Sequence, residues 1–351
     1  MKSMRPHTHF WGLGGDEMIA EGFDALHHVR DLSVTGFVEV LKHLSYFKSV
    51  MRDVLSRCEE NPPDAAILID YPGFNIRLGK ALKRLGIPVY YYISPQVWAW
   101  KKGRVHTMRQ FVQRMFVIFP FEKSFYDDYD IPVTFTGHPI VEKDFGISER
   151  VSFFKQSKID PERPVVALLP GSRRNELERL IDPMIDAIRF LKGSNPDLQF
   201  AIAGLSSLNQ SYYSPFLAIP DVHVLVDQTY SLVTHARTAI VASGTASLEV
   251  AYLGTPLVVI YRIAPLSYLI GKMLVHIDHL AMPNLILGER AIPELIQGDA
   301  TGCQIAKCTE KLLEDSADRR VMLDKLNTLQ GSLGSPGCAQ LVADSILGEI
   351  G

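Results

Sequence analysis

The sequence predicts an α/β protein made of two doubly wound, Rossmann-like domains that face a cleft. Short apolar runs alternate with helical patterns, which is typical of parallel sheets with buried strands. The 351 residues are enough for about two domains of roughly 150 residues each. A polar stretch at residues 142–164, which contains Pro161 and Pro164, separates two such series of strands and helices.

Six apolar runs carry the strand prediction, because each ends in turn residues ahead of a helical pattern. They are AAILID (65–70), VYYYIS (89–94), MFVIFP (115–120), VVALLP (165–170), FAIAG (200–204) and TAIVAS (238–243). Helical segments without strand partners close the chain at 301–313 and 319–351. We therefore expect domains at 1–145 and 146–310, with 311–351 as C-terminal helices that pack back on the first domain.

Composition narrows the class of protein. The chain is 47% hydrophobic and 21% charged, which excludes disorder, collagen-like repeats and coiled coil. A net charge of -3 argues against a nucleic-acid partner. Four cysteines in no paired pattern indicate neither disulfides nor a zinc site. The first residues lack the apolar stretch of a signal peptide, so we expect a cytoplasmic protein without a membrane span.

Residues 34–52 form the clearest predicted helix, because apolar residues recur at helical spacing between basic ones. Most such helices cover a sheet, whereas some lie on a membrane surface. The residues that would contact the membrane are Val34, Phe37, Val38, Leu41 and Leu44.

In VVALLPGSRRNELERL a buried strand runs into a small, basic turn and then a helix. Gly171 permits close backbone approach, Ser172 can donate its hydroxyl, and Arg173 or Arg174 offers a guanidinium beside helix N–H groups that favour anions. The turn therefore predicts a diphosphate site. A plain turn capped by Ser172, with solvated arginines, explains the same residues.

A second strand ends at TAIVASGTASLE. Ser243, Gly244 and Thr245 would place small donors at a helix N-terminus, and Glu249 could accept hydrogen bonds from a ribose. An ordinary N-cap followed by a first-turn acid is the alternative. Two such turns at the carboxyl ends of strands in one domain favour a ligand site, because open α/β sheets bind ligands there.

The first half carries its polar residues at strand ends as well. Asp70 closes AAILID, where it could act as a general base or cap the loop. Asn75 is either a substrate ligand or a helix cap. The next strand-end loop holds Ser94, Gln96, Trp98 and Trp100, and is followed by Lys101, Lys102 and Arg104. Aromatic residues beside cations suit sugar stacking or lipid phosphate, and surface packing is the alternative.

Nine segments in order resemble the lipid-A-disaccharide synthase family: GLGGDEM, LSVTGFVEVLKHL, IDYPGFN, SPQVWAW, FPFEKSFY, VTFTGHP, LLPGSRRNE, ASGTASLE and MPNLILG. The resemblance implies an inverting glycosyltransferase of the B type that needs neither metal nor other cofactor. Its reaction would transfer 2,3-diacylglucosamine from UDP-2,3-diacylglucosamine to the 6-hydroxyl of 2,3-diacylglucosamine 1-phosphate in lipid A biosynthesis. Acylated substrates imply peripheral association with the cytoplasmic face of the inner membrane.

The resemblance also implies roles for particular residues. Asp70 matches the essential carboxylate and Arg173 the functional arginine. The UDP-sugar side would be Gly171, Ser172, Ser243, Gly244, Thr245 and Glu249, and the acceptor side Asn75, Ser94, Gln96 and Trp98. The C-terminal helices are a candidate homodimer interface.

The chain departs from the family at its start. Family members begin with a strand that leads into a Gly-Glu-x-Ser-Gly-Asp loop and a helix, whereas this sequence opens at the following unit, FWGLGGDEM. The first domain is therefore expected to lack one strand-helix unit. Two alternatives to an active synthase stay open: a truncated or degenerate homologue that binds UDP-sugar or membrane without catalysis, and a nucleotide-sugar isomerase on the same architecture.

Overall fold

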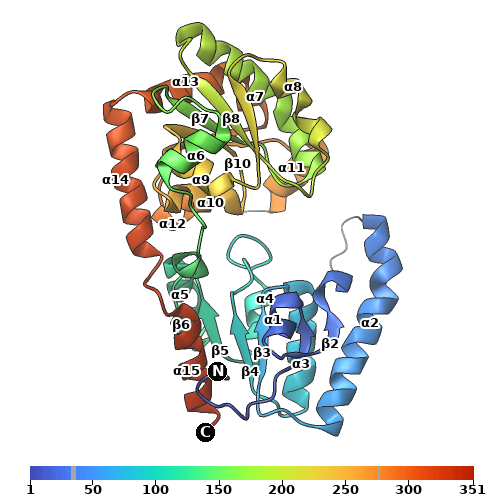
Figure 1. Cartoon of the computed structure of the whole chain (residues 1–351). Coiled ribbons are helices and arrows are strands. Elements are labelled where there is room, and N and C mark those ends of the chain that lie inside the picture. The colour runs from blue at the N-terminus through green and yellow to red at the C-terminus, as the bar shows by residue number, and fades with distance from the viewer. Residues whose placement is uncertain (33–36, 275–276) are drawn as a thin grey trace. The chain divides into compact units, whose positions relative to one another are not determined.

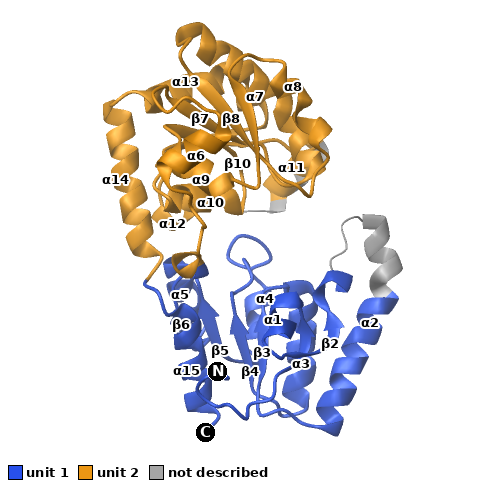
Figure 2. Ribbon diagram, in the orientation of Figure 1, with its two compact units in different colours: residues 1–139, 335–351 blue, residues 140–334 orange. Residues whose placement is uncertain are grey.

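The structure is a computed structural model that describes residues 1–32, 37–274 and 277–351. It divides into two compact units (Figure 2): unit 1 comprises Met1–Pro139 with Ser335–Gly351, and unit 2 comprises Ile140–Gly334. Both are α/β units whose sheets are parallel, as the fold-class prediction states. The linker between them begins close to the polar stretch at 142–164.

Unit 1 contains a four-stranded parallel sheet of order β3-β4-β5-β6 and a separate parallel pair, β1 and β2. The strands are β1 (Trp11–Gly14), β2 (Asp24–His28), β3 (Ala66–Ile69), β4 (Val89–Tyr92), β5 (Val112–Val117) and β6 (Val133–Phe135). The helices are α1 (Asp16–Ala20), α2 (Phe37–Glu60), α3 (Pro72–Arg84), α4 (Arg104–Met108), α5 (Pro120–Asp127) and, from the chain end, α15 (Cys338–Glu349), with a short 3-10 turn at Val29–Leu32. A second 3-10 turn, Pro139–Glu142, runs from the last residue of this part of unit 1 into unit 2.

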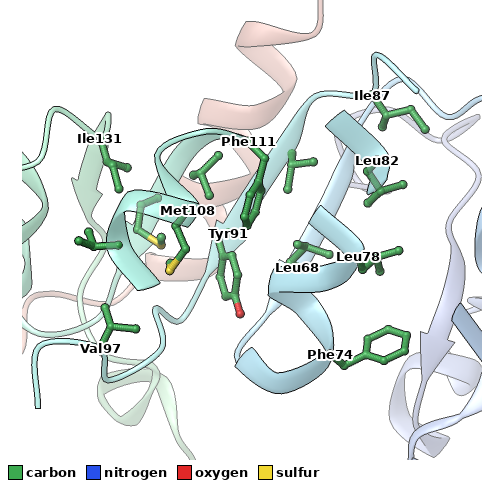
Figure 3. Packing of buried hydrophobic residues seen from close by; sticks show 14 of the residues in the cluster. Leu68, Phe74, Leu78, Leu82, Ile87, Tyr91, Val97, Met108, Phe111 and Ile131 are labelled. Atoms are coloured by element: carbon green, nitrogen blue, oxygen red, sulfur yellow. The ribbon is translucent and has the colours of Figure 1, made fainter. Parts of the chain in front are cut away.

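The core of unit 1 forms where α3 meets the sheet (Figure 3). Leu78 and Leu82 recur one turn apart on α3 and are buried with Leu68 of β3, as the amphipathic spacing of α3 predicts. A Cβ at Gly79 would lie 2.2 Å from the ring of Phe111. Glycine at this position therefore lets the aromatic ring pack directly on the helix backbone.

Helix α15 returns to unit 1 and packs against its sheet (Figure 1). Val342 and Ile346 of α15 form a small buried cluster with Tyr90 of β4 and Phe116 of β5. Its last residue, Glu349, accepts a hydrogen bond from the Tyr90 hydroxyl at 3.1 Å and pairs with Arg114. Burial, and then the Glu349 carboxylate, raise the pKa of Tyr90 to about 12.

Unit 2 contains a six-stranded parallel sheet of order β12-β11-β10-β7-β8-β9. The strands are β7 (Val165–Leu169), β8 (Gln199–Gly204), β9 (Val222–Val226), β10 (Thr238–Ala242), β11 (Leu257–Tyr261) and β12 (Glu294–Ile296). The helices are α6 (Arg150–Ser157), α7 (Arg174–Ser194), α8 (Ser214–Leu217), α9 (Thr229–His235), α10 (Thr245–Tyr252), α11 (Pro265–Leu274), α12 (Met282–Leu287), α13 (Gly302–Leu313) and α14 (Ala317–Ser332), with 3-10 turns at Gln210–Tyr213 and Gln297–Asp299.

The strand order of unit 2 reverses beside β7. The chain runs outward from β7 through β8 to β9, then returns to the opposite side of β7 as β10 and continues outward through β11 to β12. In open α/β sheets a crevice opens at the carboxyl ends of the strands where the order reverses. That point lies between β7 and β10.

The C-terminal helices divide between the units. Helices α13 and α14 belong to unit 2, and α15 alone of the three belongs to unit 1. Gly302 of α13 approaches α7 so closely that a Cβ would lie 2.4 Å from Cβ of Asp186. The segment expected at 311–351 to pack back on the first domain therefore does so from residue 335 onward, and the part before it packs on unit 2.

Candidate functional site

The two turns predicted from sequence lie side by side at the reversal point of unit 2. Leu169 at the end of β7 pairs with Val241 near the end of β10, and neighbouring strands lie about 4.8 Å apart. Residues 170–173 and 243–245 therefore leave the sheet as neighbours. Each turn leads straight into a helix, α7 after the first and α10 after the second.

The first turn depends on Gly171, whose φ of +111° L side chains rarely adopt. A Cβ there would lie 2.6 Å from Oε2 of Glu176. Helix α7 begins at Arg174 with Arg173 as its N-cap and no side-chain cap. The alternative in which Ser172 caps the helix is therefore wrong.

The carboxylate of Glu176, in the first turn of α7, occupies the place at the helix N-terminus where an anionic ligand would bind. Its carboxylate accepts a hydrogen bond from the Ser172 backbone N–H at 3.2 Å and pairs with the Arg173 guanidinium at 2.9 Å. The Arg173 side chain is 76% exposed, so little holds it in this pairing. A diphosphate that arrives at this helix terminus would compete with Glu176 for the same donors.

The second turn is open. Gly244 has a φ of +148°, and a Cβ there would meet no atom within 4 Å. It is the N-cap of α10 without a side-chain cap, and its carbonyl accepts from the backbone and hydroxyl of Ser247 at 3.1 and 2.7 Å. The N-terminus of α10 is thus uncovered, with Ser243 and Thr245 beside it.

Glu249 lies on α10 with two partners that the sequence analysis missed. Lys143 pairs with its Oε1 at 2.5 Å, and the Tyr230 hydroxyl donates to the same oxygen at 3.0 Å. The Lys143 ammonium also lies 4.5 Å from the centre of the Tyr230 ring. Both donors converge on Oε1, which leaves Oε2 for a third donor such as a ribose hydroxyl.

In unit 1, Asp70 and Tyr71 follow β3 with φ of 43° and 45°, a left-handed conformation that Asp tolerates and that tends to occur at functional sites. The Tyr91 hydroxyl donates to the Asp70 carbonyl at 2.6 Å, and the Asn75 amide donates to it at 2.8 Å. These bonds fix the backbone and leave the carboxylate outward. The residue is exposed, but surrounding protein atoms partly desolvate its carboxyl group, and this burial raises its pKa.

Asn75 supports Asp70 through hydrogen bonds to the chain. Its Nδ2 donates to Ile69 and Asp70 carbonyls at 3.0 and 2.8 Å, and the residue is 8% exposed. Both amide hydrogens are therefore directed at the backbone that holds the carboxylate.

The loop after β4 is built on a buried carboxylate, Glu122, which the sequence analysis also missed. Glu122 is 1% exposed and accepts hydrogen bonds from Ser94 Oγ (2.5 Å), Trp98 Nε1 (3.1 Å) and the backbone N–H groups of Ile118 and Phe119 (3.3 and 3.0 Å). Burial raises the pKa of this carboxyl, while the four hydrogen bonds oppose the shift. Ser94 and Trp98 are thus tied to the protein interior.

Two other side chains of this loop are exposed. Gln96 is exposed, and Trp100 is 39% exposed. Lys101 Nζ lies 4.4 Å and the Arg104 guanidinium 5.4 Å from the Trp100 ring centre. Two cations at an exposed indole form a surface suited to an anionic or sugar-bearing ligand.

The predicted membrane-facing residues lie outside what the structure describes. Val34 falls in residues 33–36, and the side chains of Phe37, Val38, Leu41 and Leu44 are not described, although α2 begins at Phe37. Among the described residues, no helix is long and apolar enough to cross a membrane. The described residues also contain no group of three or more His, Cys, Asp or Glu side chains that could hold a metal ion.

The fold is shared with glycosyltransferases and with UDP-GlcNAc 2-epimerases. The calicheamicin glycosyltransferase CalG4 matches with a TM-score of 0.61 at 18% identity, covering 99% of this chain and 92% of that one. UDP-GlcNAc 2-epimerase from Neisseria meningitidis, solved with UDP-GlcNAc, matches with a TM-score of 0.59 at 15% identity, covering 97% of this chain and all of that one. The fold therefore defines a two-domain, Rossmann-like protein of the glycosyltransferase B type.

Sequence comparison resolves the family. The family described as lipid-A-disaccharide synthetase matches residues 1–338. Lipid-A-disaccharide synthase from Geobacter sulfurreducens is 39% identical over 99% of this chain and 91% of its own length, and that from Koribacter versatilis is 39% identical over 96% and 89%. The chain belongs to the lipid-A-disaccharide synthase family, a family of glycosyltransferases of lipid A biosynthesis.

Proposed function

We propose that this chain transfers 2,3-diacylglucosamine from UDP-2,3-diacylglucosamine to the 6-hydroxyl of 2,3-diacylglucosamine 1-phosphate. The products are lipid A disaccharide 1-phosphate and UDP. The observation that carries the proposal is the pair of glycine-dependent helix N-termini at the reversal point of unit 2, in a chain of this family.

Unit 2 would bind the UDP moiety. The uncovered N-terminus of α10 and the donors around Ser172 favour a diphosphate. Arg173 would exchange Glu176 for the phosphate as UDP leaves, so that its charge stabilises the leaving group. Lys143 and Tyr230 would hold Glu249 so that Oε2 accepts from the ribose.

Unit 1 would supply the base. As the acceptor oxygen forms its bond to the sugar C1, the bond from C1 to the UDP oxygen breaks with inversion, and the hydroxyl proton passes to a carboxylate. We assign that role to Asp70, because its backbone is fixed by Asn75 and Tyr91 and the residue is exposed. A raised pKa makes this carboxylate a stronger base than an ordinary aspartate.

We further propose that the protein works at the cytoplasmic face of the inner membrane, since both substrates are acylated. Two features support this. Leu269 and Met273 lie one turn apart on α11 and are 58% and 71% exposed, and the cations around Trp100 suit anionic headgroups.

The test is UDP release in detergent, with and without the acceptor. The parent chain should release UDP when both substrates are present, and Asp70→Asn should lose at least a hundredfold in rate. Asparagine tolerates the left-handed backbone at this position, so the variant keeps the fold. Asp64→Asn, an exposed carboxylate just before the same strand, is the matched control and should keep full activity.

Two results would overturn the proposal. Turnover of the nucleotide sugar without acceptor would indicate a nucleotide-sugar isomerase, the activity named for the epimerase neighbours. Folded parent protein that binds UDP-sugar but releases no UDP would indicate a binding protein. Unchanged rates in Asp70→Asn would remove the assigned base while leaving the transfer itself intact.

A further inference from the structure

Unit 2 has a cavity at the amino ends of its central strands, at the opposite end of the sheet from the turns described above. It has a volume of about 420 Å³ and is bordered by α6, the loop before β7, the end of α9 and the start of α14. The side chains that give it its character are Arg150, Phe154, Arg163, His235, Arg237 and Arg319. Four of these six are arginines.

The cavity is separate from the proposed UDP site. Val165, which lines it, is the first residue of β7, and Arg237 directly precedes Thr238 at the start of β10. The proposed UDP site begins after the last residues of these strands. The length of β7 therefore separates the two by about 13 Å, at 3.3 Å per residue.

Two of the four arginines are matched by carboxylates. Arg163 pairs with Asp221 at 3.1 Å, and Arg237 pairs with Asp315 at 2.5 Å. Arg150 and Arg319 have no carboxylate within 4.0 Å among the residues that the structure describes. Glu162 also lines the cavity, and this residue is exposed.

Arg319 is the most constrained of the four. It is 9% exposed, and its Nη1 donates to the carbonyls of Arg237 and Leu312 at 2.7 and 2.6 Å. Burial, and then the neighbouring Arg237 guanidinium, lower the pKa of Arg319. The Asp315 carboxylate opposes this shift without cancelling it. A buried cation is costly, and a further anion beside it would remove part of that cost.

Donors remain for such an anion. Arg150 uses Nη2 on the Pro161 carbonyl at 3.1 Å, and its guanidinium lies 4.7 Å from the Phe154 ring centre. A guanidinium carries five N–H donors, so the bonds to carbonyls leave several on Arg150 and Arg319. Planar guanidinium groups bind phosphate oxygens in pairs.

We propose that this cavity binds a phosphate-bearing anion, at a site distinct from the UDP site and independent of the proposed transfer reaction. The opposing explanation is that Arg237 and Arg319 only donate hydrogen bonds to the C-terminal carbonyls of α13, since Arg237 Nε also donates to the Leu313 carbonyl at 2.7 Å. That explanation accounts for two arginines. It does not account for Arg150, which lies on α6 and contacts Pro161 and Phe154.

The experiment is calorimetric titration of the full chain with inorganic pyrophosphate and, separately, inorganic phosphate, at low salt. Arg150→Gln should weaken pyrophosphate binding about tenfold, and Arg319→Gln should abolish it. Arg189→Gln removes an exposed arginine of α7 that pairs with Asp186 and is the matched control. Every titration contains UDP at saturating concentration, which occupies the proposed UDP site, so the binding that remains reports on the cavity.

The two probes distinguish sources of the anion. Tighter binding of pyrophosphate would indicate a diphosphate ligand, and equal binding would indicate a single phosphoryl group. Absence of binding in the parent chain, or binding as tight in Arg150→Gln as in the parent chain, would overturn the proposal. Arg150 is exposed and makes one carbonyl contact, so its variant tests the proposal even where Arg319→Gln fails to fold.

Discussion

Replacing Glu122 by glutamine tests whether the loop after β4 depends on a buried negative charge. A glutamine can keep its oxygen toward the N–H groups of Ile118 and Phe119 and turn its NH₂ toward Ser94, whose hydroxyl can rotate to accept. The indole N–H of Trp98 then faces an amide N–H group and loses its partner.

The size of the effect follows from that lost bond. A buried donor without a partner costs about 1–3 kcal/mol, and we take about 2 kcal/mol for the half-buried Trp98. For a unit of this size that corresponds to a fall in Tm of about 4–8 °C. The freed indole should also move its fluorescence emission to longer wavelength.

The assay is thermal unfolding with tryptophan fluorescence, followed by measurement of both KM values. Glu59→Gln, which changes an exposed glutamate of α2, is the control and should leave Tm within 1 °C of the parent. If the loop binds the acceptor, KM for the acceptor rises while KM for the UDP-sugar stays constant. A Tm and emission spectrum equal to those of the parent would refute the reasoning.

Three further predictions concern the proposed transfer site. Burial raises the pKa of Asp70, so the acid limb of the kcat/KM profile should lie above that of an ordinary aspartate. The stability that comes from protonated Asp70, complete below the unfolded pKa of about 3.9, should be lost as pH rises through the raised folded pKa. Asp70→Asn should abolish this pH-dependent loss of stability. Lys143→Met removes the cation paired with Glu249. With solvent screening this ion pair contributes about 1 kcal/mol, so KM for the UDP-sugar should rise about fivefold. Gly171→Ala introduces a Cβ at φ +111° against Glu176, and UDP binding, measured by calorimetry, should weaken at least tenfold.

The substitutions at Lys143 and Gly171 have matched controls. Lys155→Met changes an exposed lysine of α6, and Gly193→Ala fills open space on α7; both should bind UDP as the parent does. A pH profile for Asp70→Asn that parallels the parent in stability would contradict the raised pKa. Normal UDP affinity in Lys143→Met would show that Glu249 does not contribute to the UDP site. Normal UDP affinity in Gly171→Ala would show the same for the first turn.

The sequence predicts best where one residue type has one physical use. Buried strands such as Val165–Leu169 and Thr238–Ala242 are continuous apolar runs, and glycines at Gly171 and Gly244 mark turns that other residues cannot form. Because both turns were assigned to the carboxyl ends of strands in one sheet, the sequence also predicted that they belong to one ligand site. Short strands such as β1 and β6 carry too few residues to show a pattern.

Residues that act through distant partners were not predictable. Glu122 lies in the first turn of α5, which begins at Pro120, and in the sequence it looks like an ordinary first-turn acid. Its partners Ser94 and Trp98 lie more than twenty residues earlier. Lys143 falls in the linker and meets Glu249 more than one hundred residues later. Such pairings arise from tertiary packing, and one sequence contains no local trace of them.

The return of α15 to unit 1 has a consequence during synthesis. Unit 2 is an insertion within unit 1, so the apolar faces of Tyr90 and Phe116 emerge from the ribosome long before Val342 and Ile346 can cover them. At about 5–20 residues per second, the roughly 200 intervening residues take about 10–40 s. During that interval the nascent first unit presents an uncovered sheet, and a chaperone that shields it would act on this protein before its last helix is made.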